Sequence, residues 1–120
     1  MTVLPDVNRA VLIVRPRQPF LDWIDSVEST LPEEERTPIT LDELVEGATA
    51  YLIPVIEDAE DLVNVLSDAW PEIFEGELAS WYADDEDWPR QRTREMFDDW
   101  FDVALHDMVF DLGHDPLKRS

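Results

Sequence analysis

The chain lacks several features that would define whole classes of protein. It contains no cysteine, which excludes a disulfide framework and a thiolate metal site. No apolar run approaches the roughly 18 residues that a membrane-spanning helix requires. The N-terminus has a short apolar run without a basic leader or a small-residue cleavage site, so it does not have the pattern of a signal peptide. We therefore expect a cytoplasmic protein.

Basic residues are scarce. The chain has 29 acidic residues against 9 basic ones, a formal net charge of −20, and no lysine or arginine occurs from residue 37 to residue 89. Such a charge repels nucleic acid and anionic lipid, so we expect neither a nucleic-acid partner nor a membrane partner. A hydrophobic content of 44 % and five tryptophans indicate a packed fold rather than a disordered chain. Any protein partner is expected to be basic, and the oligomeric state is left open.

The first part of the chain predicts a strand, a helix and a short helix. Residues 10–14 (AVLIV) form a β-branched apolar run of strand length. Pro19 suits the first position of a helix, and apolar residues follow it at helical spacing: Phe20, Trp23, Ile24, Val27 and Leu31. After an exposed loop at residues 32–38, Thr40 and Glu43 have the spacing of a capping box, which predicts one or two turns ending at Gly47.

The middle of the chain predicts a second strand and two consecutive helices. Residues 48–56 (ATAYLIPVI) have strand character, and Pro54 places a strand end or a sheet edge there. Asp58 is expected to cap the following helix. Because proline interrupts a helix, Pro71 is predicted to begin a second helix, bent against the first at Trp70.

The last part predicts a third helix and a final strand. Trp88 and Pro89 are expected to open the helix, with an inward face of Thr93, Met96, Phe97 and Trp100. From residue 101 the apolar period changes to two, so residues 101–112 predict a strand with a bulge near residues 106–108.

These elements predict an α+β fold. We expect a two-layer domain in which a small, mostly antiparallel sheet of about three strands carries the helices on one face. The 120 residues are expected to form a single domain, with a core from about residue 8 to residue 112 and a polar, frayed tail at 113–120. Trp81 and Trp100 are predicted to be largely buried in the same core as the first strand.

The C-terminal half contains the succession LxSWYxDxxxWPxxRTxxMFxxWFxVxxHxMVFDL at residues 78–112. With the preceding TAYLIPVI and the predicted helix pair, it resembles a group of small uncharacterised bacterial proteins over roughly residues 48–112. No activity is attached to that group, so the resemblance implies no site residues. The chain departs from the group's pattern at Asp107, where a small hydroxyl residue is expected.

One candidate binding site is an acidic run followed by a tryptophan: Asp84, Asp85, Glu86, Asp87 and Trp88. The run lacks the glycine and the bidentate glutamate of a calcium loop, and a solvated turn is its simplest interpretation. Carboxylates around one aromatic anchor also suit a contact surface for a basic protein. We therefore predict a non-catalytic protein with an inhibitor, immunity-type or charge-mimic role.

The alternative is a small enzyme or metal-binding domain centred on His106, Asp107 and Asp111. Imidazole nitrogens and carboxylate oxygens can bind a divalent metal. However, His106 and His114 match no standard ligand spacing, and no nucleophile with a partnered base is evident. We predict no cofactor, no metal and no catalytic residue, with this alternative left open.

The remaining candidate is a group of three arginines, Arg90, Arg92 and Arg94. Such a group can bind a phosphate or an acidic partner. Pairing within the chain requires less ordering of the chain than binding an outside ligand does. We therefore expect these arginines to pair with the acids at 84–87 and with Asp98 or Asp99.

Overall fold

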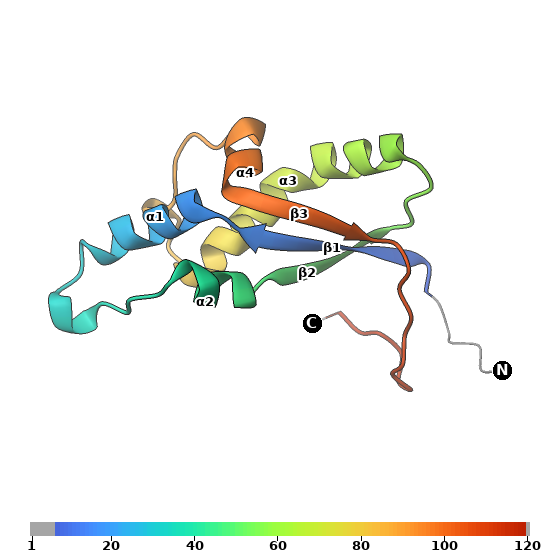
Figure 1. Cartoon of the computed structure of the whole chain (residues 1–120), viewed down its shortest axis with the longest axis horizontal. Helices are drawn as coiled ribbons and strands as arrows, with labels where there is room; N and C mark the ends of the chain where they lie inside the picture. The colour runs from blue at the N-terminus through green and yellow to red at the C-terminus, as the bar shows by residue number, and fades with distance from the viewer. Residues whose placement is uncertain (1–6, 120) are drawn as a thin grey trace.

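The computed structural model describes residues 7–119. Its elements follow the order β1 (Arg9–Pro16), α1 (Gln18–Glu28), η1 (Glu33–Glu35), α2 (Leu41–Glu46), β2 (Thr49–Pro54), α3 (Ala59–Trp81), η2 (Asp85–Asp87), α4 (Arg94–Trp100) and β3 (Phe101–His106), where η denotes a 3₁₀ helix (Figure 1). This arrangement confirms the predicted α+β fold. The molecule is elongated, with extents of 58 × 31 × 26 Å. In the described part, no helix is both long enough and apolar enough to cross a membrane.

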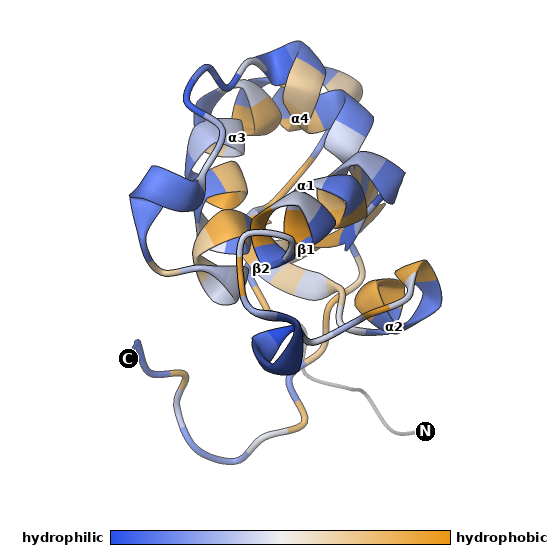
Figure 2. Ribbon diagram, turned by 90° about the vertical axis from the view of Figure 1, so that its left-hand side faces the viewer, coloured by the Kyte–Doolittle hydropathy of each residue, from blue (hydrophilic) through white to orange (hydrophobic). Residues whose placement is uncertain are grey.

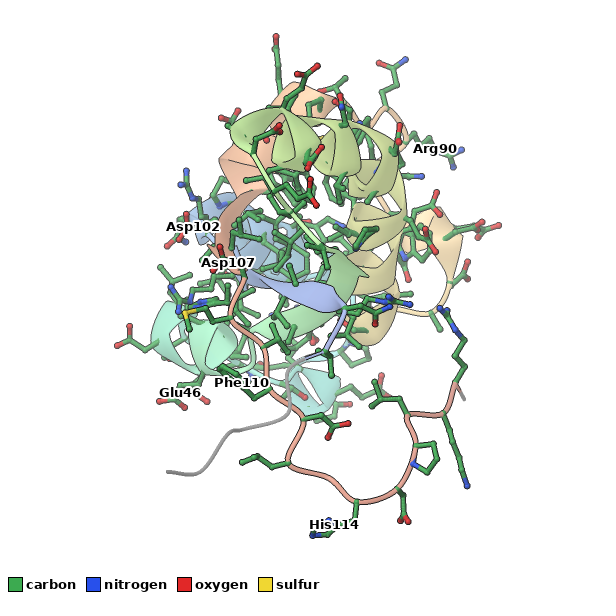
Figure 3. All side chains as sticks on the ribbon, turned by 90° about the vertical axis from the view of Figure 1, so that its right-hand side faces the viewer. Glu46, Arg90, Asp102, Asp107, Phe110 and His114 are labelled. Atoms are coloured by element: carbon green, nitrogen blue, oxygen red, sulfur yellow. The ribbon has the colours of Figure 1, made fainter. Side chains whose placement is uncertain are left out.

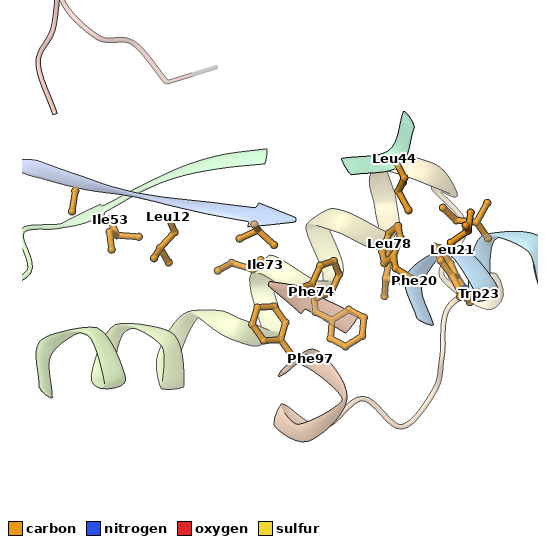
Figure 4. Close-up of a cluster of buried hydrophobic side chains, with 14 residues drawn as sticks. Leu12, Phe20, Leu21, Trp23, Leu44, Ile53, Ile73, Phe74, Leu78 and Phe97 are labelled. Atoms are coloured by element: carbon orange, nitrogen blue, oxygen red, sulfur yellow. The ribbon is translucent and has the colours of Figure 1, made fainter. Parts of the chain in front are cut away.

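The three strands form one antiparallel sheet with the order β2-β1-β3. Along β1 the side chains of Ala10, Leu12 and Val14 are buried, because alternate residues of a strand point to the same face. This inner face is turned toward α3 and α4, and Figure 4 shows Leu12 and Ile53 pointing toward α3. Val11 and Ile13 point to the opposite face, which we call the outer face.

Aromatic side chains fill the core between the sheet and the helices. The ring of Phe101, at the start of β3, lies 5.2 Å from Phe20, 5.4 Å from Phe74 and 5.2 Å from Phe97, measured between ring centroids. These four rings come from α1, α3, α4 and β3, so one cluster joins three helices to the sheet. In Figure 2 the hydrophobic segments gather around β1, and the outward sides of the helices are hydrophilic.

Local signals place several element ends correctly. Thr40 caps α2 by accepting a hydrogen bond from the Glu43 amide, and Gly47 follows the end of that helix. Asp58 caps α3 by accepting from the Asp61 amide. Pro54 is the last residue of β2, and β2 is an edge strand, so its missing N–H interrupts no ladder.

Two predicted helix boundaries are wrong. The structure has one continuous helix of 23 residues, α3, with Pro71 inside it, rather than two separate helices. Its ribbon changes direction in the middle (Figure 1), because proline bends a helix whose flanking residues stay packed. Helix α4 begins at Arg94 instead of Trp88, because Thr93 caps it by accepting from the Met96 amide at 3.1 Å.

The last strand is shorter than predicted. Strand β3 ends at His106, which pairs with Val11, and does not continue to residue 112. After a break at residues 107–109 pairing resumes locally, because Phe110 forms an isolated bridge and the Val7 amide donates to the Val109 carbonyl at 3.2 Å. Met108, within the break, is 77 % exposed. Trp81 and Trp100 are partly buried and pack against the core cluster that contains Leu12 and Val14 of β1.

Candidate partner-binding surface

The predicted binding residues form a compact turn between α3 and α4, which we call the acidic turn (residues 84–87). Asp84 starts the turn by accepting a hydrogen bond from the Glu86 amide at 3.0 Å. The amides of Asp87 and Trp88 donate to the carbonyls of Asp84 and Asp85, both at 3.1 Å. The turn is therefore a single 3₁₀ turn, and its backbone bonds leave the acidic side chains outside.

Two tryptophans fix the position of this turn. The indole N–H of Trp23, on α1, donates to the carbonyl of Asp87 at 3.0 Å. The indole N–H of Trp88 donates back to the carbonyl of Tyr82 at 2.7 Å. Buried indole groups usually find such a partner, and here both partners are backbone atoms of the same short segment. The segment from Tyr82 to Trp88 is thus attached to α1 through Asp87, and its two ends are joined by the bond from Trp88 to Tyr82.

Tyr82 strengthens the attachment to α1. Its ring contacts Trp23 in an edge-to-face arrangement with centroids 5.3 Å apart, and its hydroxyl donates to the Ile24 carbonyl at 3.4 Å. Burial raises the pKa of the Tyr82 hydroxyl above its ordinary value, and the carboxylates of Glu28, Asp87 and Asp25 raise it further. The hydroxyl therefore stays protonated and keeps its role as a donor.

The carboxylates of the acidic turn are exposed and carry no basic partner in the described part of the chain. The ion pairs between residues 7 and 119 are Arg17 with Asp102, Arg92 with Glu75, and Arg94 with Asp98. The prediction that the arginine group pairs with the acidic turn is therefore wrong, whereas its pairing with Asp98 is confirmed. Arg92 pairs with Glu75 on α3 instead, and Arg94 pairs with Asp98 one turn along α4.

Trp88 lies at the boundary between two surface grooves. One groove, of about 480 Å³, is open and mainly apolar; its lining residues are Pro19, Asp22, Trp23, Ser26, Asp87, Trp88, Pro89, Met96 and Trp100. We call it the aromatic groove. It places three indole rings beside two carboxylates. The side chain of Trp88 is half-buried.

The second groove lies on the other side of Trp88 and Pro89 and also measures about 480 Å³. Arg92 lines it together with Asp85 and Glu86, and its guanidinium lies 5.8 Å from the Trp88 ring centroid and 2.9 Å from the Glu75 carboxylate. The guanidinium thus makes a cation–π interaction with the Trp88 ring on the side of this second groove. Arg90 also lines the groove and projects from its rim (Figure 3). Of these two grooves, the aromatic groove is therefore the one that offers a mainly apolar surface next to the acids.

The alternative site is not assembled. His106 and Asp107 are exposed where β3 ends, and the Asp111 carboxylate accepts a hydrogen bond from the Gly113 amide at 2.8 Å. His114 lies at the outermost bend of the C-terminal segment, away from Asp107 (Figure 3). Within residues 7–119, no group of three or more histidine, aspartate and glutamate side chains is arranged to hold a metal ion.

One buried carboxylate was missed by the sequence reasoning. Glu77, on α3, is only 7 % exposed, and the Tyr51 hydroxyl of β2 donates to it at 2.8 Å. Burial raises the pKa of Glu77, while the bonds from Tyr51 and Thr49 oppose this increase. The available signal was spacing, since Glu77 follows the buried Ile73 and Phe74 by four and three residues. The contact joins α3 to the edge of the sheet.

Comparison with protein-family models, with curated proteins and with solved structures found no match to this chain. The resemblance of residues 48–112 to small bacterial proteins therefore stays a prediction.

Proposed function

We propose that this chain is a non-catalytic cytoplasmic binding protein whose partner is a basic protein. The partner docks on the acidic turn, with Trp88 as the aromatic anchor. One observation carries the proposal: two indole hydrogen bonds hold exposed acids that have no basic partner in the described chain beside an open aromatic groove.

The geometry favours binding because the surface is already organised. A rigid turn loses little conformational entropy when a partner binds, so more of the interaction energy remains as affinity. The carboxylates of residues 84–87 attract a basic surface from a distance, and an aromatic side chain supplies the desolvated contact. An inhibitor, an immunity-type protein and a charge mimic would all use such a surface.

The test distinguishes the effect of the acidic turn on association from the effect of the net charge of the protein. The partner is first captured from the native host with the wild-type protein, and association is then measured by stopped-flow at two salt concentrations. The variant is Asp84→Lys/Asp85→Lys, and the matched control is Glu33→Lys/Glu34→Lys in the other acidic 3₁₀ turn. Both changes alter the net charge equally. We expect the first to slow association about tenfold or more and to weaken its salt dependence, and the control to have a clearly smaller effect.

The anchor is tested by dissociation. Trp88→Ala is expected to leave the association rate nearly unchanged and to speed dissociation by roughly 30-fold, as for a hot spot of about 2 kcal/mol. Equal slowing of association by the two charge-reversal variants would show that only the net charge matters. The acidic turn would then not be the docking surface.

A further inference from the structure

The outer face of the sheet carries an apolar patch at its centre. Across it, Val11 pairs with Leu52 on one side and His106 on the other, and Ile13 pairs with Ala50 and Ala104. Leu52 is 55 % exposed, and none of these side chains belongs to the core cluster on the inner face. Helices α3 and α4 lie on the opposite side of the sheet (Figure 1). A sheet face of this kind normally packs against another layer.

The tail, defined here as residues 107–119, lies on the same side as the outer face. Figures 1 and 4 both place it on the side of the sheet away from α3. It returns toward the sheet at its end, where Leu117, Lys118 and Arg119 share a pocket of about 380 Å³ with Arg9 and Leu52. The tail therefore borders the outer face without covering it.

Exposed apolar side chains are concentrated in these two regions. Seven large hydrophobic residues of the described chain are exposed, and five of them belong to the outer face or the tail: Leu52, Met108, Phe110, Leu112 and Leu117. Single exposed apolar residues are ordinary, but such a grouping on one side of a small protein marks an interaction surface.

The charge of this region differs from that of the rest of the chain. The outer face and the tail together contain four basic residues, Arg9, Arg15, Lys118 and Arg119, and four acidic ones, Asp102, Asp107, Asp111 and Asp115. The region is thus neutral, and the whole formal charge of −20 lies elsewhere in the sequence. Two copies of a strongly acidic protein repel each other least where their surfaces are neutral.

We propose that the outer face and the tail form an interface with a second copy of this chain. A two-fold pairing lets one apolar patch serve both partners and brings mixed charges, rather than acids, together. It also leaves the acidic turn exposed, because the turn packs on α1 through Trp23, on the helical side of the sheet. The pair would present two acidic turns to solvent.

The test is sedimentation velocity of the full chain over a range of protein and salt concentrations. We expect a dimer whose affinity rises with salt, since salt screens the repulsion between two acidic molecules. Leu52→Asp on the outer face and Leu112→Asp in the tail should each weaken the dimer at least about tenfold, because a buried unpaired carboxylate is costly. Val63→Asp is the matched control: Val63 is 60 % exposed on α3, and this substitution should change the affinity less than about twofold.

A monomer at every protein and salt concentration would overturn the proposal, whether the tail closes on its own sheet or another protein covers it. A dimer that is insensitive to both aspartate variants would overturn it as well, because it would use another surface, such as the edge of β2. The circular dichroism of each variant shows whether it is folded. Binding of a basic partner weakens with salt whereas this dimer strengthens, so the two proposals fail in different experiments.

Discussion

The two acidic 3₁₀ turns of this protein have the same length and charge, but different groups hold them in place. Glu33–Glu35 is followed by Arg36, whose guanidinium donates to the carbonyls of Leu31 and Ser29 at 3.0 and 3.2 Å. Asp85–Asp87 is fixed instead by the indole groups of Trp23 and Trp88. The first turn is tied locally by an exposed side chain, and the second is tied to a helix 64 residues away in the sequence.

The surfaces beside the two turns also differ in their aromatic content. The pocket next to the first turn contains no aromatic residue; its lining residues are Asp25, Glu28, Ser29, Glu33, Arg36, Thr37 and Pro38. The groove next to the second turn contains three tryptophans. Exposed acids alone steer a partner, whereas acids beside a desolvated aromatic contact can also retain it. The comparison shows why one acidic turn, and not the other, is the candidate surface.

The largest expected effect is loss of the attachment to α1. Trp23 is only 8 % exposed and packs on Phe20 as well as on Tyr82, so Trp23→Ala should lower the free energy of unfolding by about 3–5 kcal/mol. Arg36→Ala should cost less than about 1 kcal/mol, because its hydrogen bonds are exposed. Urea denaturation of both variants measures the difference. Similar losses would mean that the two turns are held equally strongly.

A smaller effect is expected at the other end of the acidic turn. Trp88→Phe keeps an aromatic ring but removes the donor to the Tyr82 carbonyl, a hydrogen bond worth about 0.5–1.5 kcal/mol. Amide hydrogen exchange should therefore speed up by up to about tenfold at Asp87 and Trp88. The amides of Glu35 and Arg36 serve as the internal control. Unchanged exchange at Asp87 and Trp88 would show that the indole bond does not order the turn.

Both turns were visible in the sequence as acidic runs, but what distinguishes them was not. Local rules predicted the caps at Thr40 and Asp58 and the buried strand β1, because these depend on near neighbours. The bond from Trp23 to Asp87 depends on how α1 packs against the end of α3, which no local pattern encodes. The end of β3 likewise depends on its pairing with β1, in which Val11 and His106 are the last registered pair, and no local pattern encodes that pairing.

The smallest effect concerns a buried acid on α3, the helix that leads to the acidic turn. Because burial raises the pKa of Glu77 in the folded protein, the folded state retains this proton to a higher pH than the unfolded state does. Stability from this group is therefore complete below the ordinary pKa of glutamate and is lost as the pH rises through the folded value. Glu77→Gln removes the charge while keeping an acceptor for the Tyr51 hydroxyl and a donor for Thr49.

We expect the variant to be more stable than the wild type at neutral pH, with the difference shrinking as the pH falls. Melting temperatures from pH 4 to pH 8 measure it, and Glu34→Gln in the exposed turn is the control, for which a nearly constant small difference is expected. A glutamine variant that is less stable at neutral pH would mean that the charged form of Glu77 strengthens the bond from Tyr51 by more than its burial costs.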